Sequence, residues 1–250
     1  MGKVESYILH KIASEGNIHF TLIDPDKVQP AQAVQIAKQL ENLGTAAIMI
    51  GGSTVVSVSQ LDEVVKKVQK SVQIPVILFP NHITGISQYA DAILFMSLLN
   101  SDNPLFISGI QALGAPLIKR YHLETLPLGY IIIDSGSTAA YIGQARALPR
   151  DKPEIAASFA LAAQYLGMRF VYLEAGSGAK NPVPYEMIRY VKQIIDIPLI
   201  VGGGIKTKKV ARNIVKSGAD IIVTGTVIES MEQMQDISEI ITAIHSKTAN

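Results

Sequence analysis

Short runs of apolar residues, many of them β-branched, alternate along the chain with longer stretches in which apolar positions recur at helical spacing. Most of the short runs are apolar at nearly every position, which is typical of parallel strands covered on both faces. Eight of them predict strands, at residues 18–23, 46–50, 76–79, 92–96, 129–133, 169–173, 199–201 and 220–223.

The longer stretches between these runs predict amphipathic helices. In the first, Val34, Ala37 and Leu40 follow helical spacing, whereas Lys38 and Glu41 fall on the opposite face. Seven such helices are expected, at residues 31–43, 60–71, 104–119, 153–166, 185–195, 208–217 and 237–245. The chain therefore reads as a strand followed by a helix, repeated along its length.

Eight strand-then-helix units in 250 residues are what a TIM (β/α)8 barrel, an α/β fold, requires. The competing architecture is a doubly wound open sheet. Its dinucleotide-binding members carry GxGxxG after the first strand, where this chain has Asp24-Pro25-Asp26-Lys27. Glycine-rich turns come after the seventh and eighth strands instead, where such barrels often bind phosphate. No linker or low-complexity segment divides the chain, so we expect a single domain over residues 1–250.

The connection between the third and fourth predicted strands is unusually short. Only residues 80–90 join them, with Pro80 and Gly85 among them. A crossover between parallel strands needs at least about 10–12 residues. We therefore expect an irregular, helix-poor connection there, and a gap in the outer ring of helices.

Composition and charge narrow the functional classes. Hydrophobic residues make up 48% of the chain and charged residues 17%, with a formal net charge of +1. These values exclude intrinsic disorder and argue against nucleic-acid binding, which needs a large basic field. The absence of cysteine excludes disulfides, thiolate metal sites and cysteine nucleophiles. No run approaches the roughly 18 apolar residues of a membrane helix and no signal-peptide core is present, so we expect a cytoplasmic protein.

Polar and small residues follow the first two strands, at the end of the barrel where active sites lie. Asp24 could hold Mg²⁺, which typically takes one or two protein carboxylates, or it could cap the next helix. The turn Gly51-Gly52-Ser53 suits a metal or phosphate contact, and it equally suits a tight turn before a helix. Asp24 and Ser53 are therefore candidate metal-binding residues, and a helix cap or a tight turn is the structural alternative.

Tyr172 and Glu174 lie two residues apart on the sixth strand, so they share one side of it. In a barrel that side can be the lumen. A glutamate among apolar lumen residues is costly unless it has a partner or a role, which makes Glu174 a functional candidate. The alternative is a solvated residue at the strand end.

Two glycine-rich loops follow the last two strands, Gly202-Gly203-Gly204 and Thr224-Gly225-Thr226. Free backbone N–H groups near helix N-termini form anion sites, so the pair predicts phosphate binding, with two ordinary tight turns as the alternative. The five histidines show no zinc-site spacing, and we expect His10, His82 and His122 to be surface or packing residues.

Together the loops resemble those of the geranylgeranylglyceryl phosphate synthases. These are TIM-barrel prenyltransferases that include the bacterial PcrB-type heptaprenylglyceryl phosphate synthases. The resemblance spans nearly the full length, and residues 172–179 followed by Pro182-Val183-Pro184 are similar to the second of the two family groups. It rests on Leu22-Ile23-Asp24-Pro25-Asp26-Lys27, Gly51-Gly52-Ser53, Tyr172-Leu173-Glu174-Ala175-Gly176-Ser177-Gly178-Ala179, Val201-Gly202-Gly203-Gly204-Ile205 and Thr224-Gly225-Thr226.

The resemblance implies an enzyme that transfers a prenyl group from geranylgeranyl diphosphate to the 3-hydroxyl of sn-glycerol 1-phosphate and releases diphosphate. It implies Mg²⁺ as cofactor, with Asp24 and Ser53 at the metal positions, and Glu174 is the carboxylate of the sixth-strand motif that could take the proton of the incoming hydroxyl. The implied glycerol-phosphate contacts are Tyr172, Leu173, Glu174, Ala175, Gly176, Ser177, Gly178, Gly203, Gly204, Gly225 and Thr226.

Further expectations concern partners and the prenyl tail. We expect a homo-oligomer, a dimer or a hexamer, with transient contact to a membrane surface. A barrel interior is packed, so the tail would need a groove beside residues 80–90, with Ile83, Ile86 and Tyr89 as candidate walls.

Two other functional readings stay open. A phosphosugar isomerase or cyclase would use Asp24 and Asp134 as its acid/base pair, and a non-catalytic barrel would only sense a phosphate ligand.

Overall fold

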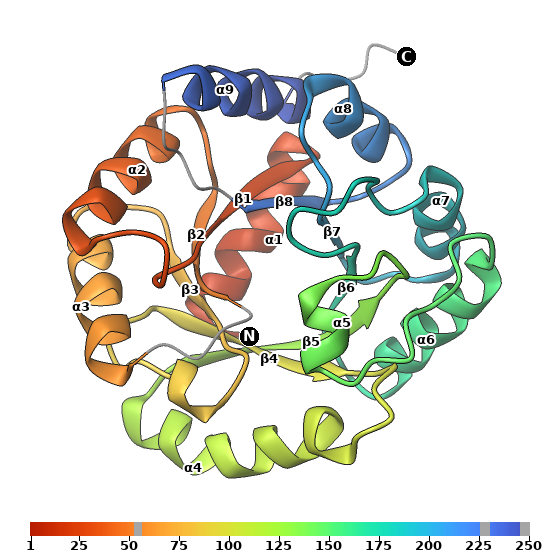
Figure 1. Cartoon of the computed structure of the whole chain (residues 1–250), viewed down its shortest axis with the longest axis horizontal. Helices are drawn as coiled ribbons and strands as arrows, with labels where there is room; N and C mark the ends of the chain where they lie inside the picture. Colours follow the sequence, from red (N-terminus) through yellow and green to blue (C-terminus); the bar gives the residue numbers. More distant parts are fainter. Residues whose placement is uncertain (53–56, 226–230, 246–250) are drawn as a thin grey trace.

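The computed structural model describes residues 1–52, 57–225 and 231–245, except for the side chains of residues 231–234. Its centre is a closed barrel of eight parallel strands that pair in chain order, with the last strand against the first (Figure 1). The strands are β1 (Ile18–Ile23), β2 (Ala47–Gly51), β3 (Val76–Phe79), β4 (Ala92–Leu98), β5 (Glu124–Ile132), β6 (Phe170–Glu174), β7 (Leu199–Gly202) and β8 (Ile221–Gly225). The predicted (β/α)8 barrel is confirmed.

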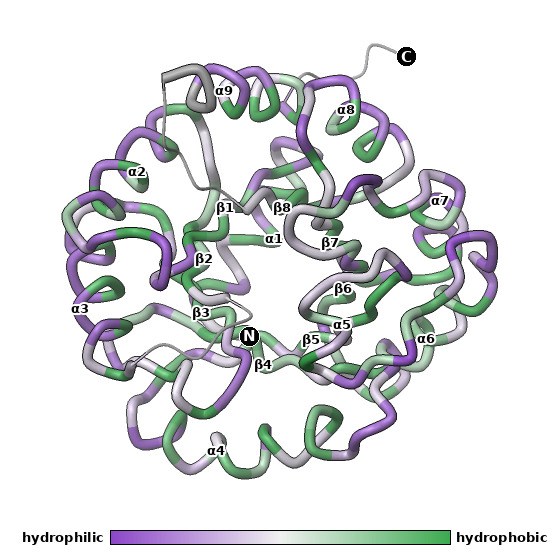
Figure 2. The backbone as a smooth tube through the Cα atoms, in the orientation of Figure 1, coloured by the Kyte–Doolittle hydropathy of each residue, from purple (hydrophilic) through white to green (hydrophobic). Residues whose placement is uncertain are grey.

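An outer ring of helices surrounds the strands (Figure 1). Most of these helices turn apolar residues toward the barrel, as the hydropathy colouring of Figure 2 shows, whereas Leu113 of α4 is exposed. In α8, for example, Ala211, Ile214 and Val215 are buried. The ring contains α2 (Pro30–Asn42), α3 (Val58–Gln69), α4 (Ile110–Tyr121), α6 (Pro153–Tyr165), α7 (Tyr185–Ile194), α8 (Lys208–Lys216) and α9 (Met231–His245).

Side chains alternate between two buried layers along each strand, as a period of two requires. Residues such as Phe20, Met49 and Tyr172 fill the barrel lumen. Their strand neighbours, such as Leu173 and Val201, pack outward against the helices. This alternation decides which residues at the strand ends can reach a site at the barrel mouth.

The connection between β3 and β4 is as short as expected. It contains only η1, a single 3-10 turn (Ile83–Gly85). One turn of π-helix, η2 (Leu105–Gly109), precedes α4 on the other side of β4. Such turns are rare and occur often at functional sites.

Helix α1 (Lys3–Glu15), which the sequence analysis did not predict, lies across the amino ends of the strands. The Glu124 carboxylate at the start of β5 accepts the backbone N–H groups of Val4 and Glu5, both at 2.8 Å, and so caps the helix. Capping of this kind satisfies N–H groups that have no partner within the helix. The buried Glu5 also pairs with Arg169, at 2.6 Å.

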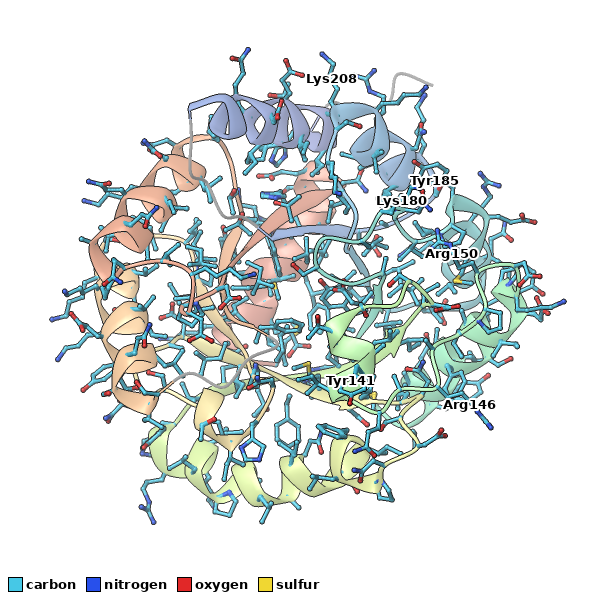
Figure 3. All side chains as sticks on the ribbon, in the orientation of Figure 1. Tyr141, Arg146, Arg150, Lys180, Tyr185 and Lys208 are labelled. Carbon is cyan, nitrogen blue, oxygen red and sulfur yellow. The ribbon has the colours of Figure 1, made fainter. Side chains whose placement is uncertain are left out.

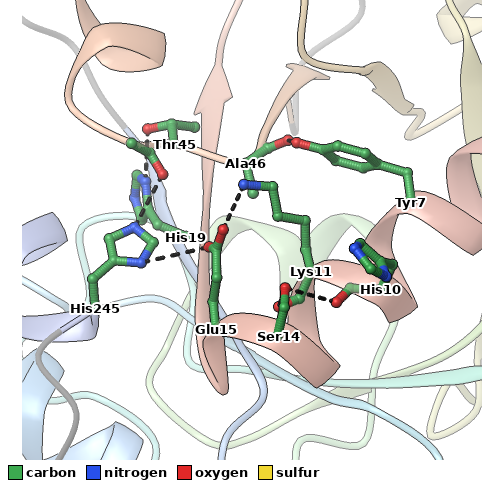
Figure 4. Close-up of polar contacts among 10 residues, drawn as sticks. Tyr7, His10, Lys11, Ser14, Glu15, His19, Thr45, Ala46 and His245 are labelled. Atoms are coloured by element: carbon green, nitrogen blue, oxygen red, sulfur yellow. Dashed lines mark hydrogen bonds and ion pairs between the residues drawn. The ribbon is translucent and has the colours of Figure 1, made fainter.

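Polar contacts at the same end of the barrel involve residues of α1, β1 and α9 (Figure 4). Glu15 bonds Lys11 at 2.6 Å and lies 3.8 Å from His245. The buried His19 ring bonds the hydroxyls of Thr45 at 2.9 Å and Thr224 at 2.8 Å. Burial lowers the pKa of His19 to about 3, so its ring is neutral at ordinary pH. These contacts therefore stabilise the packing of the elements.

None of the described helices is long and apolar enough to cross a membrane.

Candidate active site

A cavity of about 760 Å³ opens at the carboxyl ends of the strands and continues beneath α4. It brings together many of the site residues expected from the sequence: Asp24, Tyr172, Glu174, Ser177, Gly178, Gly203, Gly204 and Gly225. Ser53 and Thr226 lie outside the described residues.

Three further expected contacts lie beside the cavity and do not line it. Leu173 and Ala175 point away from the lumen into the layer between strands and helices, because they alternate with Tyr172 and Glu174. Gly176 takes part through its backbone, since its N–H donates to Glu174 Oε1 at 2.5 Å. Leu173 and Ala175 can therefore shape the site only through their backbone.

Glu174 ends β6 with its carboxylate buried in the cavity wall. The hydroxyls of Tyr172 and Tyr130 donate hydrogen bonds to it, in addition to the Gly176 N–H. Burial raises the pKa of Glu174, and these three hydrogen bonds oppose the rise because they favour the charged form. A buried carboxylate held in this way is suited to taking up and releasing a proton.

Tyr130 is a site residue that the sequence analysis missed. It lies on β5 directly opposite Tyr172 of β6, and the two rings meet edge to face at 5.2 Å between centroids. Phe79, the last residue of β3, completes the cluster at 5.8 Å from Tyr130 and 6.0 Å from Tyr172. The alternation along β5 could have indicated it, but an aromatic residue in a strand is usually a packing residue.

The triple glycine that begins with the last residue of β7 is required by close packing around Glu174. A Cβ on Gly203, whose φ is +84°, would lie 2.5 Å from Glu174 Oε1. A Cβ on Gly204, whose φ is +70°, would lie 2.8 Å from the backbone of Asn181 and Pro182. Side chains at these two positions would be strained and would fill the polar end of the cavity.

Asp24 stands at the opposite side of the polar end, with its side chain 17% exposed. Its carboxylate accepts the Asp26 N–H at 3.1 Å and lies 3.4 Å from Lys27 Nζ. A Cβ on Gly52 would lie 2.8 Å from Asp24 Oδ1, so the glycine leaves the carboxylate open.

The Asp24 carboxylate is a ligand of the kind that Mg²⁺ prefers. Within the ranges described above, no group of three or more His, Cys, Asp or Glu side chains could enclose a metal ion. A hard ion that takes one or two carboxylates and leaves its other positions to water and substrate phosphates suits such a site.

Two lysines and a histidine also reach the cavity, and the sequence analysis did not assign them to the site. Lys27 and Lys206 line it near Asp24 and the triple glycine, and His82 lines it after β3. His82 is exposed, as expected of a surface residue, and it also lines the cavity. Asp134 is exposed and does not line the cavity, so it forms no acid/base pair there with Asp24.

The other end of the cavity is an apolar arm between the β3–β4 connection and α4. Neither Ile83 nor Tyr89 lines it, although Ile86 does, as expected. Its remaining apolar walls come from β4 and from the helical stretch after it: Ile93, Phe95, Phe106, Ile110, Gly114 and Ile118. The helix-poor connection therefore borders a slot that is open to a long apolar group.

The hydrogen bond from Tyr130 predicts how Glu174 titrates. Tyr130→Phe removes a donor that favours the carboxylate, so the pKa of Glu174 should rise further above its usual value. The measurement is a pH titration followed by NMR of ¹³C-labelled glutamate. Tyr141→Phe, on a fully solvated ring of α5 (Thr138–Ile142), is the matched control. An unchanged or lower pKa in Tyr130→Phe would contradict the assigned bond.

Comparison with solved structures confirms the fold. The crystal structure of (S)-3-O-geranylgeranylglyceryl phosphate synthase from Thermoplasma acidophilum, in complex with its substrate sn-glycerol-1-phosphate, superposes with a TM-score of 0.93. It is 40% identical and the match covers 99% of this chain and 100% of that one. Wild-type GGGPS from Thermoplasma volcanium gives a TM-score of 0.94 at 40% identity, over 99% of both chains.

Sequence relatives give the same picture. The geranylgeranylglyceryl phosphate synthase of Pyrococcus abyssi is 57% identical over 236 residues, which is 94% of each chain. The sequence pattern of the family described as the PcrB family matches residues 10–244 of this chain. The chain therefore belongs to the PcrB family.

Proposed function

We propose that the protein transfers the geranylgeranyl group of geranylgeranyl diphosphate to the 3-hydroxyl of sn-glycerol 1-phosphate, with release of diphosphate. One observation carries the proposal: the buried Glu174 carboxylate lies where a glycine-lined polar end and a long apolar arm of one cavity meet. A small phosphorylated acceptor suits the first and an isoprenoid suits the second. The bound sn-glycerol-1-phosphate of the Thermoplasma acidophilum relative supports this choice of acceptor.

The polar end suits the acceptor phosphate. Gly203, Gly204 and Gly225 line it without side chains, so a phosphate can approach the backbone closely. Lys206 supplies a positive charge at the same end. The glycerol hydroxyls would then lie toward Glu174 and Tyr172.

Glu174 is suited to accept the proton of the 3-hydroxyl as that oxygen bonds to the prenyl carbon. Tyr172, Tyr130 and the Gly176 N–H hold the carboxylate in place, and the raised pKa of Glu174 brings it closer to the range in which a base works at neutral pH. The two tyrosines keep their own protons, because burial raises the pKa of each well above its usual value.

Asp24 and Ser53 are the residues that would hold Mg²⁺. Bound there, the ion supplies Lewis-acid stabilisation of the leaving diphosphate. Lys27 and His82 line the same region of the cavity and can contact the diphosphate directly. The protein's own part is to gather the negative charge at this end and keep the prenyl tail in the apolar arm.

The apolar arm suits the prenyl tail on energetic grounds. Each CH₂ group removed from water contributes about 0.8 kcal/mol, so a long isoprenoid gains considerably from burial. The arm runs from Phe79 past Ile86 to Ile118. The tail thus lies outside the packed lumen, in the space beside the missing helix.

The direct test is incubation with labelled sn-glycerol 1-phosphate and a series of prenyl diphosphates, with the product identified by mass. We expect geranylgeranylglyceryl phosphate and diphosphate, and loss of turnover when a chelator removes Mg²⁺. Absence of any prenylated product, or prenylation of another acceptor alone, would refute the proposal.

Gly114 predicts the reach of the apolar arm. It is buried, and a Cβ there would lie 3.0 Å from Ile86 Cδ1, so Gly114→Leu should fill the arm near its far end. We expect kcat/KM with geranylgeranyl diphosphate to fall by at least about tenfold, the loss of roughly two buried CH₂ groups. The kcat/KM with shorter prenyl diphosphates should equal that of the wild type.

The control for that prediction is Ala115→Leu, on the adjacent exposed position of α4. It should alter neither chain length preference nor rate. Equal losses for every chain length in Gly114→Leu would place the tail elsewhere.

We also propose that the protein works in the cytoplasm as a dimer or hexamer and meets a membrane surface transiently, where its substrate and product partition. Large apolar side chains such as Tyr141, Tyr165 and Leu166 are exposed on the single chain and are available for such contacts. Light scattering and vesicle sedimentation test the two parts separately.

A further inference from the structure

The loop after β6 carries part of the polar end of the cavity. Ser177 and Gly178 line the cavity, and the loop continues through Asn181 and Pro182 before α7 begins. Loops are held less firmly than strands, so the position of this one depends on what bonds to it. The contacts that hold it identify the residues that shape the phosphate site.

Neighbouring segments contact the loop at several points along its length. At its start, the Ser135 hydroxyl donates to the Ala175 carbonyl. Farther along, Gly204 packs so closely on Asn181 and Pro182 that a Cβ would lie 2.8 Å from their backbone atoms. The loop after β7 therefore rests against the loop after β6.

Arg150 holds the loop at that same point. Its Nη2 donates to the Pro182 carbonyl at 2.6 Å, and its Nη1 donates to the Asp134 carbonyl at 3.4 Å. Among the residues that the structure describes, no other side chain bonds to residues 177–184. The guanidinium thus ties the loop after β6 to the segment after β5.

The position of Arg150 is visible in Figure 3, where it lies with Lys180 and Tyr185 near the start of α7. Arg146, from the same segment, lies apart from them beside α6. The side chain of Arg146 makes no hydrogen bond or ion pair to any described residue, and it is exposed. The two arginines therefore carry the same charge on the same segment, but only the side chain of Arg150 bonds to the loop.

We propose that Arg150 is a positioning residue for the acceptor phosphate. By fixing Pro182 against Gly204, it holds the loops after β6 and β7 in one arrangement, so that both present their backbone to a single anion. The inference rests on the proposed function, because it takes that anion to be the phosphate of sn-glycerol 1-phosphate. An arginine is needed, since its planar fork can bond two carbonyl groups at once, whereas a lysine offers a single charged point.

The test compares Arg150→Gln and Arg150→Lys with Arg146→Gln as the matched control. Calorimetry measures the affinity for sn-glycerol 1-phosphate, and steady-state kinetics give kcat and both KM values. We expect Arg150→Gln to weaken acceptor binding and raise its KM about tenfold, the order of effect for bonds from a charged donor. The kcat and the KM for geranylgeranyl diphosphate should stay within about twofold, Arg150→Lys should be intermediate, and Arg146→Gln should match the wild type.

Hydrogen exchange of the ligand-free protein gives a readout that needs no substrate. Amides of residues 175–184 should exchange faster in Arg150→Gln than in the wild type or Arg146→Gln. Unchanged exchange, unchanged acceptor affinity, or an equal loss for both substrates with a lowered Tm would each overturn the proposal. A wild-type protein that binds no sn-glycerol 1-phosphate overturns the proposed function, and the assigned anion with it, while the exchange rates still decide whether Arg150 holds the loop.

Discussion

Glu174→Gln should lower kcat by about 10²–10⁴-fold, the usual contribution of a general base. The amide keeps the size of the side chain and can still accept the Gly176 N–H bond, but it cannot take a proton from the acceptor hydroxyl. Affinity for geranylgeranyl diphosphate should change little, because the carboxylate faces the acceptor end. Single-turnover kinetics with saturating substrates measure the effect.

The matched control is Glu186→Gln, an exposed glutamate in the first turn of α7. It removes the same charge at a position away from the cavity and should leave kcat unchanged. A loss of only a few-fold in Glu174→Gln would mean that Glu174 positions the glycerol hydroxyls and that another group accepts the proton.

Asp24→Asn should lower turnover by about a thousandfold or more while the protein stays folded and still binds sn-glycerol 1-phosphate. Several kcal/mol of transition-state stabilisation are expected from a metal ion at a leaving diphosphate, and each 1.4 kcal/mol is about a tenfold change in rate. An amide is a poorer ligand for a hard ion than a carboxylate. The measurement is kcat as a function of Mg²⁺ concentration, beside calorimetry with the acceptor.

Asp102→Asn is the control for that change, since Asp102 is exposed after β4 and does not line the cavity. Near-normal kcat in Asp24→Asn at all Mg²⁺ concentrations would reduce Asp24 to a turn residue. It would then serve only to accept the Asp26 N–H and to pair with Lys27.

The barrel could be predicted because its signal is local and repeated. Parallel strands buried on both faces are apolar at nearly every position, and the helices between them carry one apolar face. Helix α1 could not be predicted in the same way. Its cap is supplied by Glu124, far along the chain, and only the closed barrel brings that carboxylate to Val4 and Glu5.

The site residues also divide into those that the sequence predicts and those that it does not. Glu174 could be found because a charged residue in an apolar strand stands out, and Gly203 and Gly204 because consecutive glycines rarely have another use. Tyr130 and Arg150 gave no such signal. The role of each depends on a neighbour from another strand or loop, Tyr172 for the one and Pro182 for the other.

The junction at Glu174 has a consequence for inhibitor design. The glycine-lined end and the apolar arm open into one another without an intervening wall, as parts of the same cavity. A single compound with a phosphate at one end and an isoprenoid chain at the other could fill both, and the second contact would then form at high effective concentration. Its affinity should exceed that of either fragment by orders of magnitude, provided that its linker matches the distance past Glu174.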